Sequence, residues 1–169
     1  MLFEPNGDIY YAKWNTTHTH TGVKDMTHRV AVAEILGGKR VLGREVTSLK
    51  DLQDILLAGL PYEAFIFITN KLRIGREEAS SALTISNRTL IRRKAAKRFK
   101  VDESDRIARL ARITAKAIET LGTEEKATNW LRKPNRALGG VVPLHLTSTD
   151  IGARQVEDIL SKIEYGIFS

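Results

Sequence analysis

Residues 75–100 read GREEASSALTISNRTLIRRKAAKRFK, and this stretch decides the fold of the chain. Its first part carries the small residues Ala79, Ser80 and Ala82, which are compatible with a short helix. A turn of about three residues follows, and the Ser86 hydroxyl can cap a second helix that begins at Asn87. Two short helices joined by so short a turn have the spacing of a helix-turn-helix motif.

The second helix of this motif is strongly cationic. Residues 85–100 contain seven lysines and arginines and no acidic residue. Helical periodicity predicts that Leu90 and Ile91 point one way, toward the core. The other side would then be polar and cationic, with Arg88, Thr89, Arg92 and Arg93. Such a side suits the DNA major groove, where arginine pairs with guanine and the amides of a helix N-terminus meet a phosphate.

Two explanations compete for this charge: a DNA-binding surface and an ordinary solvated helix face. The helix-turn-helix spacing and the absence of acidic partners for salt bridges favour DNA. The cations that trail beyond the helix, from Lys94 to Lys100, would contact phosphates. The residues predicted to bind DNA are Ser86, Asn87, Arg88, Thr89, Arg92, Arg93, Lys97 and Arg98.

Helical periodicity also surrounds this motif. Apolar residues recur at helical spacing over residues 29–38, 48–59, 102–122 and 149–166, with Ser48 as an N-cap and glycines as stops. Pro61 is expected to start a helix that is apolar nearly all round and therefore buried. Residues 124–130 predict a short helix that ends before a loop at Pro134. Because no alternating strand pattern occurs, the predicted class is all-α.

The last helix is predicted to bury one apolar stripe. The stripe consists of Ile151, Val156, Ile159, Leu160 and Ile163. The residues expected to face water are Glu157, Asp158, Ser161 and Lys162. Core positions are also expected for Trp130 and Leu144.

Composition narrows the class of protein. A chain of 169 residues with 42% hydrophobic residues can form one or two small domains, and a net charge of +7 favours a polyanionic partner. The absence of cysteine excludes disulfides and thiolate sites and fits a reducing cytoplasm. No apolar run approaches the roughly 20 residues of a membrane span, and no signal peptide is recognisable. We expect a cytoplasmic protein without membrane contact.

Few residues point to catalysis or to a cofactor. His18, His20 and His28 lie in a polar arm, where solvated histidines are more common than a metal site. His145 has no nucleophile or base beside it and is expected in a loop or half-buried. The glycines at 37–38 and 139–140 are turn signals and do not form a dinucleotide fingerprint. We therefore expect no enzyme activity, no cofactor and no metal.

Residues 84–113 and 127–169 resemble the Xre/MbcA/ParS-type antitoxins of bacterial type II toxin–antitoxin pairs. The resemblance covers residues 60–169, is looser over 30–60 and hardly includes the first 28. It is most specific in the C-terminal part, at Trp130, Leu131, Pro134, Asn135, Leu138, Gly139, Pro143, Leu144, Gly152, Val156 and Gly166.

This resemblance implies an organisation and two partners. It implies an Xre-like helix-turn-helix domain at 61–122 and a toxin-binding domain at 123–169, preceded by an irregular arm at 1–28 and a helical segment at 29–60, which the residue pattern predicts. The implied protein partner is a RES-class toxin that destroys NAD, whose active-site mouth the antitoxin covers. The complex would repress its own operon, and a homodimer would match a two-fold symmetric double-stranded operator. The implied toxin-binding residues are Trp130, Pro134, Asn135, Leu138, Gly139, Tyr165, Gly166, Ile167, Phe168 and Ser169.

Two features keep alternatives open. Thr84 stands where many helix-turn-helix turns carry glycine, and a β-branched residue resists positive φ, so the turn geometry is uncertain. The tail around Gly166 places Tyr165, Ile167 and Phe168 where little core is left to join, which suggests a partner. The alternatives are a free-standing regulator whose C-terminal half dimerises or senses a ligand, and a pure interaction protein.

Overall fold

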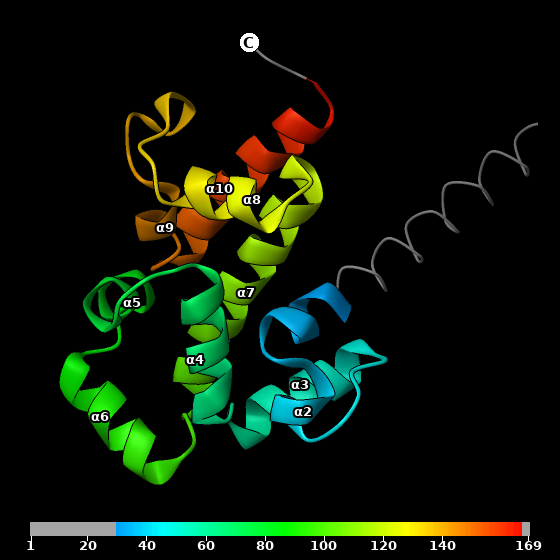
Figure 1. The fold of residues 1–169 in the computed structure, drawn as a ribbon, viewed down its shortest axis with the longest axis vertical. Coiled ribbons are helices and arrows are strands. Elements are labelled where there is room, and N and C mark those ends of the chain that lie inside the picture. The colour runs from blue at the N-terminus through cyan, green and yellow to red at the C-terminus, as the bar shows by residue number, and fades with distance from the viewer. Residues whose placement is uncertain (1–29, 167–169) are drawn as a thin grey trace, which may run out of the picture.

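The computed structural model describes residues 30–166, which form helices joined by loops, with no strand in that range (Figure 1). This confirms the predicted all-α class. Residues 30–35 are helical. The elements that follow are α2 (Gly38–Leu42), α3 (Leu49–Ala58), α4 (Tyr62–Lys71), α5 (Arg76–Leu83), α6 (Asn87–Ala96), α7 (Val101–Leu121), α8 (Glu124–Leu131), the 3-10 helix η1 (Arg136–Leu138), α9 (Pro143–Leu146) and α10 (Asp150–Glu164). The predicted arm, with His18, His20 and His28, lies outside the described residues.

The long helix α7 organises the molecule. Its 21 residues give it a length of about 31 Å, and α3, α5, α8 and α10 all pack against it. The predicted apolar residues of this helix are buried from Ile107 to Ala117, and Gly122 ends it in a left-handed conformation as expected. One hydrophobic core therefore runs from the N-terminal helices to α10.

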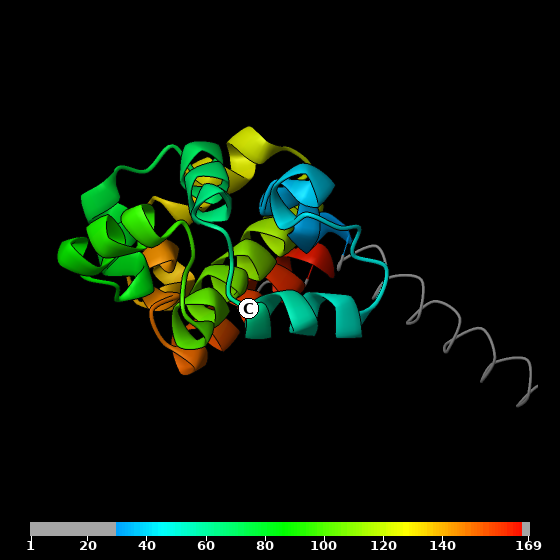
Figure 2. The ribbon, with the colours of Figure 1, turned by 90° about the horizontal axis from the view of Figure 1, so that it is seen from below.

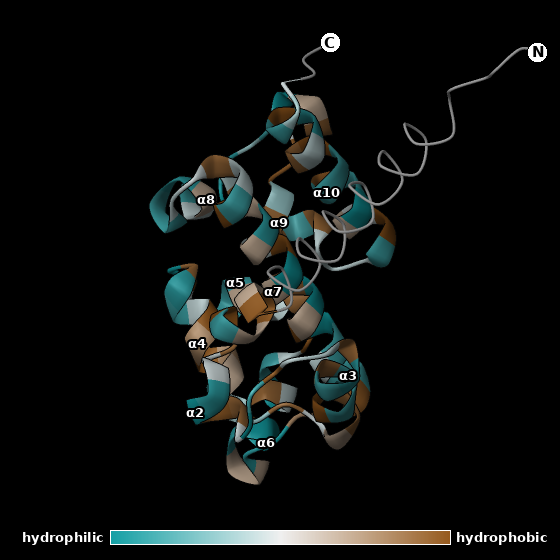
Figure 3. Cartoon of the chain, turned by 90° about the vertical axis from the view of Figure 1, so that its right-hand side faces the viewer, coloured by the Kyte–Doolittle hydropathy of each residue, from teal (hydrophilic) through white to brown (hydrophobic). Residues whose placement is uncertain are grey.

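The elements are spread along α7. α6 and α10 lie toward opposite ends of the longest axis of the molecule (Figure 1). Seen from below, α5 and α6 lie at one edge and the N-terminal helices lie on the other side (Figure 2). Most helices carry both hydrophilic and hydrophobic residues, as expected of helices that cover a shared core (Figure 3).

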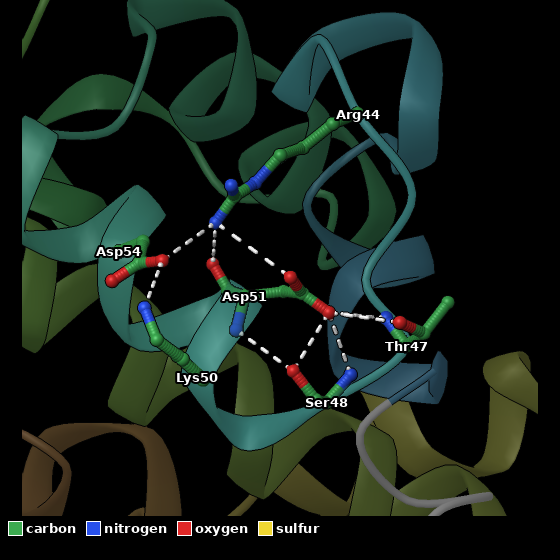
Figure 4. Close-up of polar contacts among 6 residues, drawn as sticks. All are labelled: Arg44, Thr47, Ser48, Lys50, Asp51 and Asp54. Carbon is green, nitrogen blue, oxygen red and sulfur yellow. Dashed lines mark hydrogen bonds and ion pairs between the residues drawn. The ribbon is translucent and has the colours of Figure 1, made fainter.

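The start of α3 shows how a local signal forms a helix end. The Ser48 hydroxyl accepts a hydrogen bond from the Asp51 amide at 3.1 Å, and the Ser48 amide donates one to the Asp51 carboxylate at 2.8 Å, which forms a capping box. Thr47 adds its amide and hydroxyl to the same carboxylate (Figure 4). The hydrogen bonds from Ser48 and Thr47 lower the pKa of Asp51 to about 2. The predicted N-cap at Ser48 is thereby confirmed.

A short antiparallel contact closes the chain around the helix-turn-helix. The amide of Tyr62 donates to the carbonyl of Lys97 at 3.0 Å, and the amide of Phe99 donates to the carbonyl of Leu60 at 2.8 Å. The ring of Phe99 stacks on that of Tyr62, with 5.6 Å between the ring centroids. The segment after α6 is thus tied to the segment before α4.

Three N-terminal details differ from the predictions. Gly37 and Gly38 both have positive φ, as expected of glycines that end a helix. However, a further helix, α2, begins at Gly38, so the chain turns there and continues as a helix. Pro61 is the N-cap of α4 and not its first residue. The predicted burial of α4 nearly all round is wrong, since Ile66 is 40% exposed.

The stripe predicted for α10 is only partly correct. Val156 and Leu160 are fully buried, but Ile151 is 75% exposed, because the buried side of α10 runs through Gly152, Ala153, Val156 and Leu160 instead. Glu157 pairs with Arg112 of α7 at 2.8 Å, and Ser161 accepts a hydrogen bond from Lys116 of the same helix. The expectation that Glu157 and Ser161 face water is therefore wrong. Polar contacts between α7 and α10 account for their position.

Candidate functional site

The predicted helix-turn-helix is present as α5 and α6, with residues 84–86 between them. The Ser86 hydroxyl accepts a hydrogen bond from the Thr89 amide at 3.2 Å, so Ser86 is the N-cap of α6 as predicted. The same hydroxyl lies 3.0 Å from the Thr89 hydroxyl and donates to it. The side chains of Ser86 and Thr89 therefore stabilise the N-terminus of α6.

Thr84 adopts the conformation that glycine favours at such a turn. Its φ of 52° and ψ of 42° are left-handed, which is unfavourable for a β-branched residue. The surrounding contacts hold it there: Arg106 donates to the Thr84 carbonyl at 2.8 Å, and the Ser80 hydroxyl donates to the Ile85 carbonyl at 2.7 Å. The side chain of Ile85 is buried. The turn keeps its shape at a cost in backbone strain.

We expect the Thr84→Gly variant to be more stable than the wild type by about 0.5–1 kcal/mol. Relief of the left-handed strain, about 1–2 kcal/mol, exceeds the extra freedom of glycine in the unfolded chain, roughly 0.5–1 kcal/mol. Thermal and urea unfolding measure the difference. Ser81→Gly, three residues earlier and helical, is the matched control and should lose about 0.5 kcal/mol or more. A Thr84→Gly variant that loses as much as Ser81→Gly would show that the turn is unstrained.

The buried side of α6 differs from the prediction. Leu90 is fully buried as expected, but Ile91 is 58% exposed, and the second buried residue of the helix is Arg93. Because roughly 3.6 residues make one turn, burial of positions 90 and 93 directs positions 88, 91, 92 and 95 away from the protein. We call Arg88, Ile91, Arg92 and Ala95 the outer face of α6; all four are exposed.

Arg93 is committed to the interior. Its guanidinium donates two hydrogen bonds to the Glu103 carboxylate of α7, from Nε at 2.6 Å and from Nη2 at 2.9 Å. The two side chains are only 10% and 8% exposed. Burial raises the pKa of the Glu103 carboxyl, but the hydrogen bonds from Arg93 and the Lys100 amide outweigh it and leave that pKa below its usual value. The prediction that Arg93 faces outward without an acidic partner is wrong.

Arg98 also has a structural role. Its guanidinium donates to the carbonyls of Ala58 and Gly59, at 3.2 and 2.7 Å, where α3 ends. Lys97 caps the C-terminus of α6 with a φ of 56°, and its side chain is exposed. Of these two cations, Arg98 is bonded to the end of α3, whereas the charge of Lys97 faces solvent.

Several predicted DNA-binding residues remain on one exposed surface. Arg88 and Arg92 lie on the outer face of α6, and Asn87, Lys94 and the C-cap Lys97 are exposed elsewhere on this helix. Within residues 30–166, the ion pairs involve none of these cations. An uncompensated cationic helix surface of this kind concentrates phosphate groups around it.

The predicted toxin-binding residues fall into two groups, and the first is a loop. The Asn135 amide donates to the Val141 carbonyl at 3.1 Å, and the Asn135 side chain accepts from the Ala137 amide at 2.9 Å. Gly139 is left-handed, with a φ of 67°, so this loop closes on itself around η1. Trp130 and Leu138 are half-buried and pack against the core, whereas Pro134 is exposed.

The second group lies at the end of α10. Tyr165 is 68% exposed, and Gly166 has a φ of 65°. Ile167, Phe168 and Ser169 lie outside the described residues. Of the residues expected in the core, Leu144 is fully buried, while Ile159 and Ile163 are half-buried. His145 is exposed and lies on α9, which corrects the expectation of a loop or half-buried position.

Comparison with known proteins identifies both halves of the chain. Residues 51–112 match the model of the antitoxin Xre-like helix-turn-helix domain, and residues 116–166 match that of the antitoxin Xre/MbcA/ParS C-terminal toxin-binding domain. A protein of Photorhabdus laumondii named Antitoxin Xre is 35% identical over 132 residues, which cover 77% of this chain and 89% of the relative.

The chain belongs to the Xre antitoxin family.

Two further relatives carry the same name, Antitoxin Xre. The protein from Yersinia enterocolitica is 37% identical over 98 residues, or 57% of this chain and 66% of the relative. The one from Pseudomonas putida is 44% identical over 66 residues, or 39% and 42% of the two chains.

The two antitoxin domains share structural elements. The first match ends at residue 112 and the second begins at 116, both within the continuous helix α7. Arg132 at the end of α8 pairs with Glu78 of α5 at 3.2 Å, and the Thr147 hydroxyl lies 3.4 Å from the Ala82 carbonyl. The helix-turn-helix and the toxin-binding domain of this antitoxin are thus joined by a shared helix and by direct contacts.

Other features fit a regulator. Membership of an antitoxin family points to a non-enzymatic role. In residues 30–166 the structure holds no group of three histidine or acidic side chains arranged to bind a metal. A bilayer could not be crossed by any helix of that range, given their lengths and hydropathies.

Proposed function

We propose that this chain neutralises a RES-class, NAD-degrading toxin by covering its active site, and that it binds its own operon as a dimeric repressor. The observation that carries the first part is the match of residues 116–166 to a toxin-binding domain. The second part rests on the uncompensated cations of α6 within a helix-turn-helix. The dimer follows from the two-fold symmetry that helix-turn-helix operators usually have.

In this proposal α6 enters the major groove with its outer face toward the bases. Arg88 and Arg92 are four residues apart, about 6 Å along the helix, so their guanidinium groups can reach neighbouring base pairs. Lys94 and Lys97, exposed toward the end of the helix, contact phosphates. Arg93 and Arg98 hold the helix in place from inside the protein and are no longer among the proposed DNA contacts.

Arg88→Ala and Arg92→Ala should each weaken binding to the operator by about 1–3 kcal/mol, because each removes a contact to a base. Lys97→Ala should weaken all sequences alike and reduce the salt slope by about one. Mobility shifts on DNA upstream of the gene, over a range of salt concentrations, measure both effects. Lys126→Ala on α8 removes the same charge far from α6 and serves as the control. Unchanged binding by the Arg88, Arg92 double variant would contradict the assignment of α6.

The C-terminal end of α10 is proposed to contribute to toxin neutralisation. Tyr165 is exposed there, and the sequence that follows adds the apolar residues Ile167 and Phe168. Aromatic side chains such as those of Tyr165 and Phe168 are enriched where proteins bind a partner.

Deletion of residues 165–169 should weaken the toxin complex about tenfold or more, while DNA binding and melting temperature stay nearly unchanged. The removed residues follow α10 and lie beyond its buried positions at Val156 and Leu160, so the loss belongs to the interface. Toxin affinity, growth rescue and melting temperature are measured on the same truncated protein. If the truncation lowers the melting temperature, and neutralisation is lost only as a consequence of that lower stability, the tail belongs to the core. Unchanged affinity and full rescue would refute its role.

A free-standing helix-turn-helix regulator is the second candidate. It shares the surface of α6 but needs no toxin. Co-purification with the product of the neighbouring gene, together with growth rescue on co-expression, distinguishes the two functions. NAD consumption by that partner, and its inhibition by this chain, tests the RES assignment itself.

A further inference from the structure

The outer face of α6 holds an apolar side chain between two cations. Ile91 is 58% exposed, while its neighbour Leu90 is fully buried. Arg88 and Arg92, also exposed, flank it along the helix. A single exposed isoleucine is common on protein surfaces, but here it occupies the middle of the surface that carries the uncompensated charge.

Ile91 lies close enough to the two arginines for all three side chains to reach one partner. Arg88 precedes Ile91 by three residues, about 4.5 Å along the helix, and Arg92 follows it by one, so the three side chains share one approach to a partner. The cations select a partner that is anionic. Under the proposed function this partner is duplex DNA, and the apolar feature of its major groove is the C5-methyl group of thymine.

We infer that Ile91 contacts the C5-methyl group of a thymine between the base pairs reached by Arg88 and Arg92, and so contributes to operator specificity. This inference rests on the proposed DNA binding. It adds to the two cationic contacts a residue that reads a base without any hydrogen bond. The β-branched side chain is restricted at χ1 in a helix, so it presents its apolar surface in a defined direction.

The test uses the same DNA prepared with thymine or with uracil, which lacks the C5-methyl group. The probe is the DNA upstream of the gene, amplified with either deoxythymidine or deoxyuridine triphosphate. Wild-type protein should bind the thymine DNA more tightly, by about fourfold for each methyl group that Ile91 covers. Ile91→Ala should bind thymine DNA more weakly by a similar factor and should no longer distinguish the two DNAs.

Two controls separate this effect from others. Ile151→Ala removes a similarly exposed isoleucine from the first turn of α10, outside the helix-turn-helix, and should keep the wild-type preference for thymine. Melting temperatures establish that each variant is folded. Because Ile91 is exposed and alanine favours helices, its substitution is not expected to unfold α6.

Each remaining outcome overturns the inference in a recognisable way. Equal binding of thymine and uracil DNA by the wild type excludes a methyl contact. An Ile91→Ala variant that keeps the full preference shows that another residue or the shape of the DNA reads the methyl group. If the wild type binds neither DNA, the proposed DNA binding itself has failed, and the inference falls with it.

Discussion

Replacing Glu103 by alanine should destabilise the fold by about 3–5 kcal/mol, the usual cost of leaving one member of a buried ion pair uncompensated. The Arg93 guanidinium would keep its charge in a position only 10% exposed, without its two hydrogen bonds. The Lys100 amide, which donates to Glu103 at 2.8 Å, would lose its partner at the start of α7. Since domains are commonly stable by only about 5–15 kcal/mol, much of the total stability depends on this contact.

Urea unfolding measures the loss, and the chain offers a close control. Asp102→Ala removes the preceding carboxylate, whose side chain is 64% exposed and pairs with Arg106 at 3.6 Å. An exposed pair of this kind contributes less than about 1 kcal/mol. Replacing both Arg93 and Glu103 by leucine should restore much of the stability, because no buried charge remains. Similar losses for Glu103→Ala and Asp102→Ala would contradict the buried ion pair.

Gly59→Ala should cost about 3 kcal/mol or more, because strain and overlap act together. The residue has a φ of 86° and a ψ of 135°, a backbone conformation that residues other than glycine rarely adopt. A Cβ atom at this position would overlap the backbone carbonyl oxygen of Phe99. That backbone cannot move away easily, since the Phe99 amide is bonded to Leu60 at 2.8 Å and the Leu60 amide to Ser104 at 2.8 Å.

Substitutions at two other glycines distinguish the cost of backbone strain from the cost of atomic overlap. Gly122→Ala introduces a side chain at a φ of 84° into open space, and should cost only about 1–2 kcal/mol from the left-handed backbone. Gly75→Ala has neither positive φ nor a nearby atom, and should be neutral or slightly stabilising. Thermal unfolding of the three variants gives the order. If Gly59→Ala is as stable as Gly122→Ala, the contact with Phe99 is not tight.

Several of the predictions that failed concern which side of a helix is buried. On α6 the apolar Ile91 was expected inside and the charged Arg93 outside, as hydrophobic periodicity favours. The acid that offsets the burial of Arg93 is Glu103, on the next helix. A capping signal was visible, because Glu103 stands three residues after Lys100 and accepts its amide hydrogen bond. Nothing in the local pattern connected that carboxylate with Arg93.

The sequence by itself determined most of the longer helices, several of their ends and the two-helix motif, because periodicity, hydroxyl caps and glycine stops act over a few neighbouring residues. Ser48, Ser86 and Gly122 lie where those signals predicted. Only the tertiary structure decided which charges are available to a partner. Arg93 is paired inside the protein, and Arg98 is bonded to the end of α3. Such pairings join separate helices, and their free energy depends on burial and distance, which no short stretch of sequence contains.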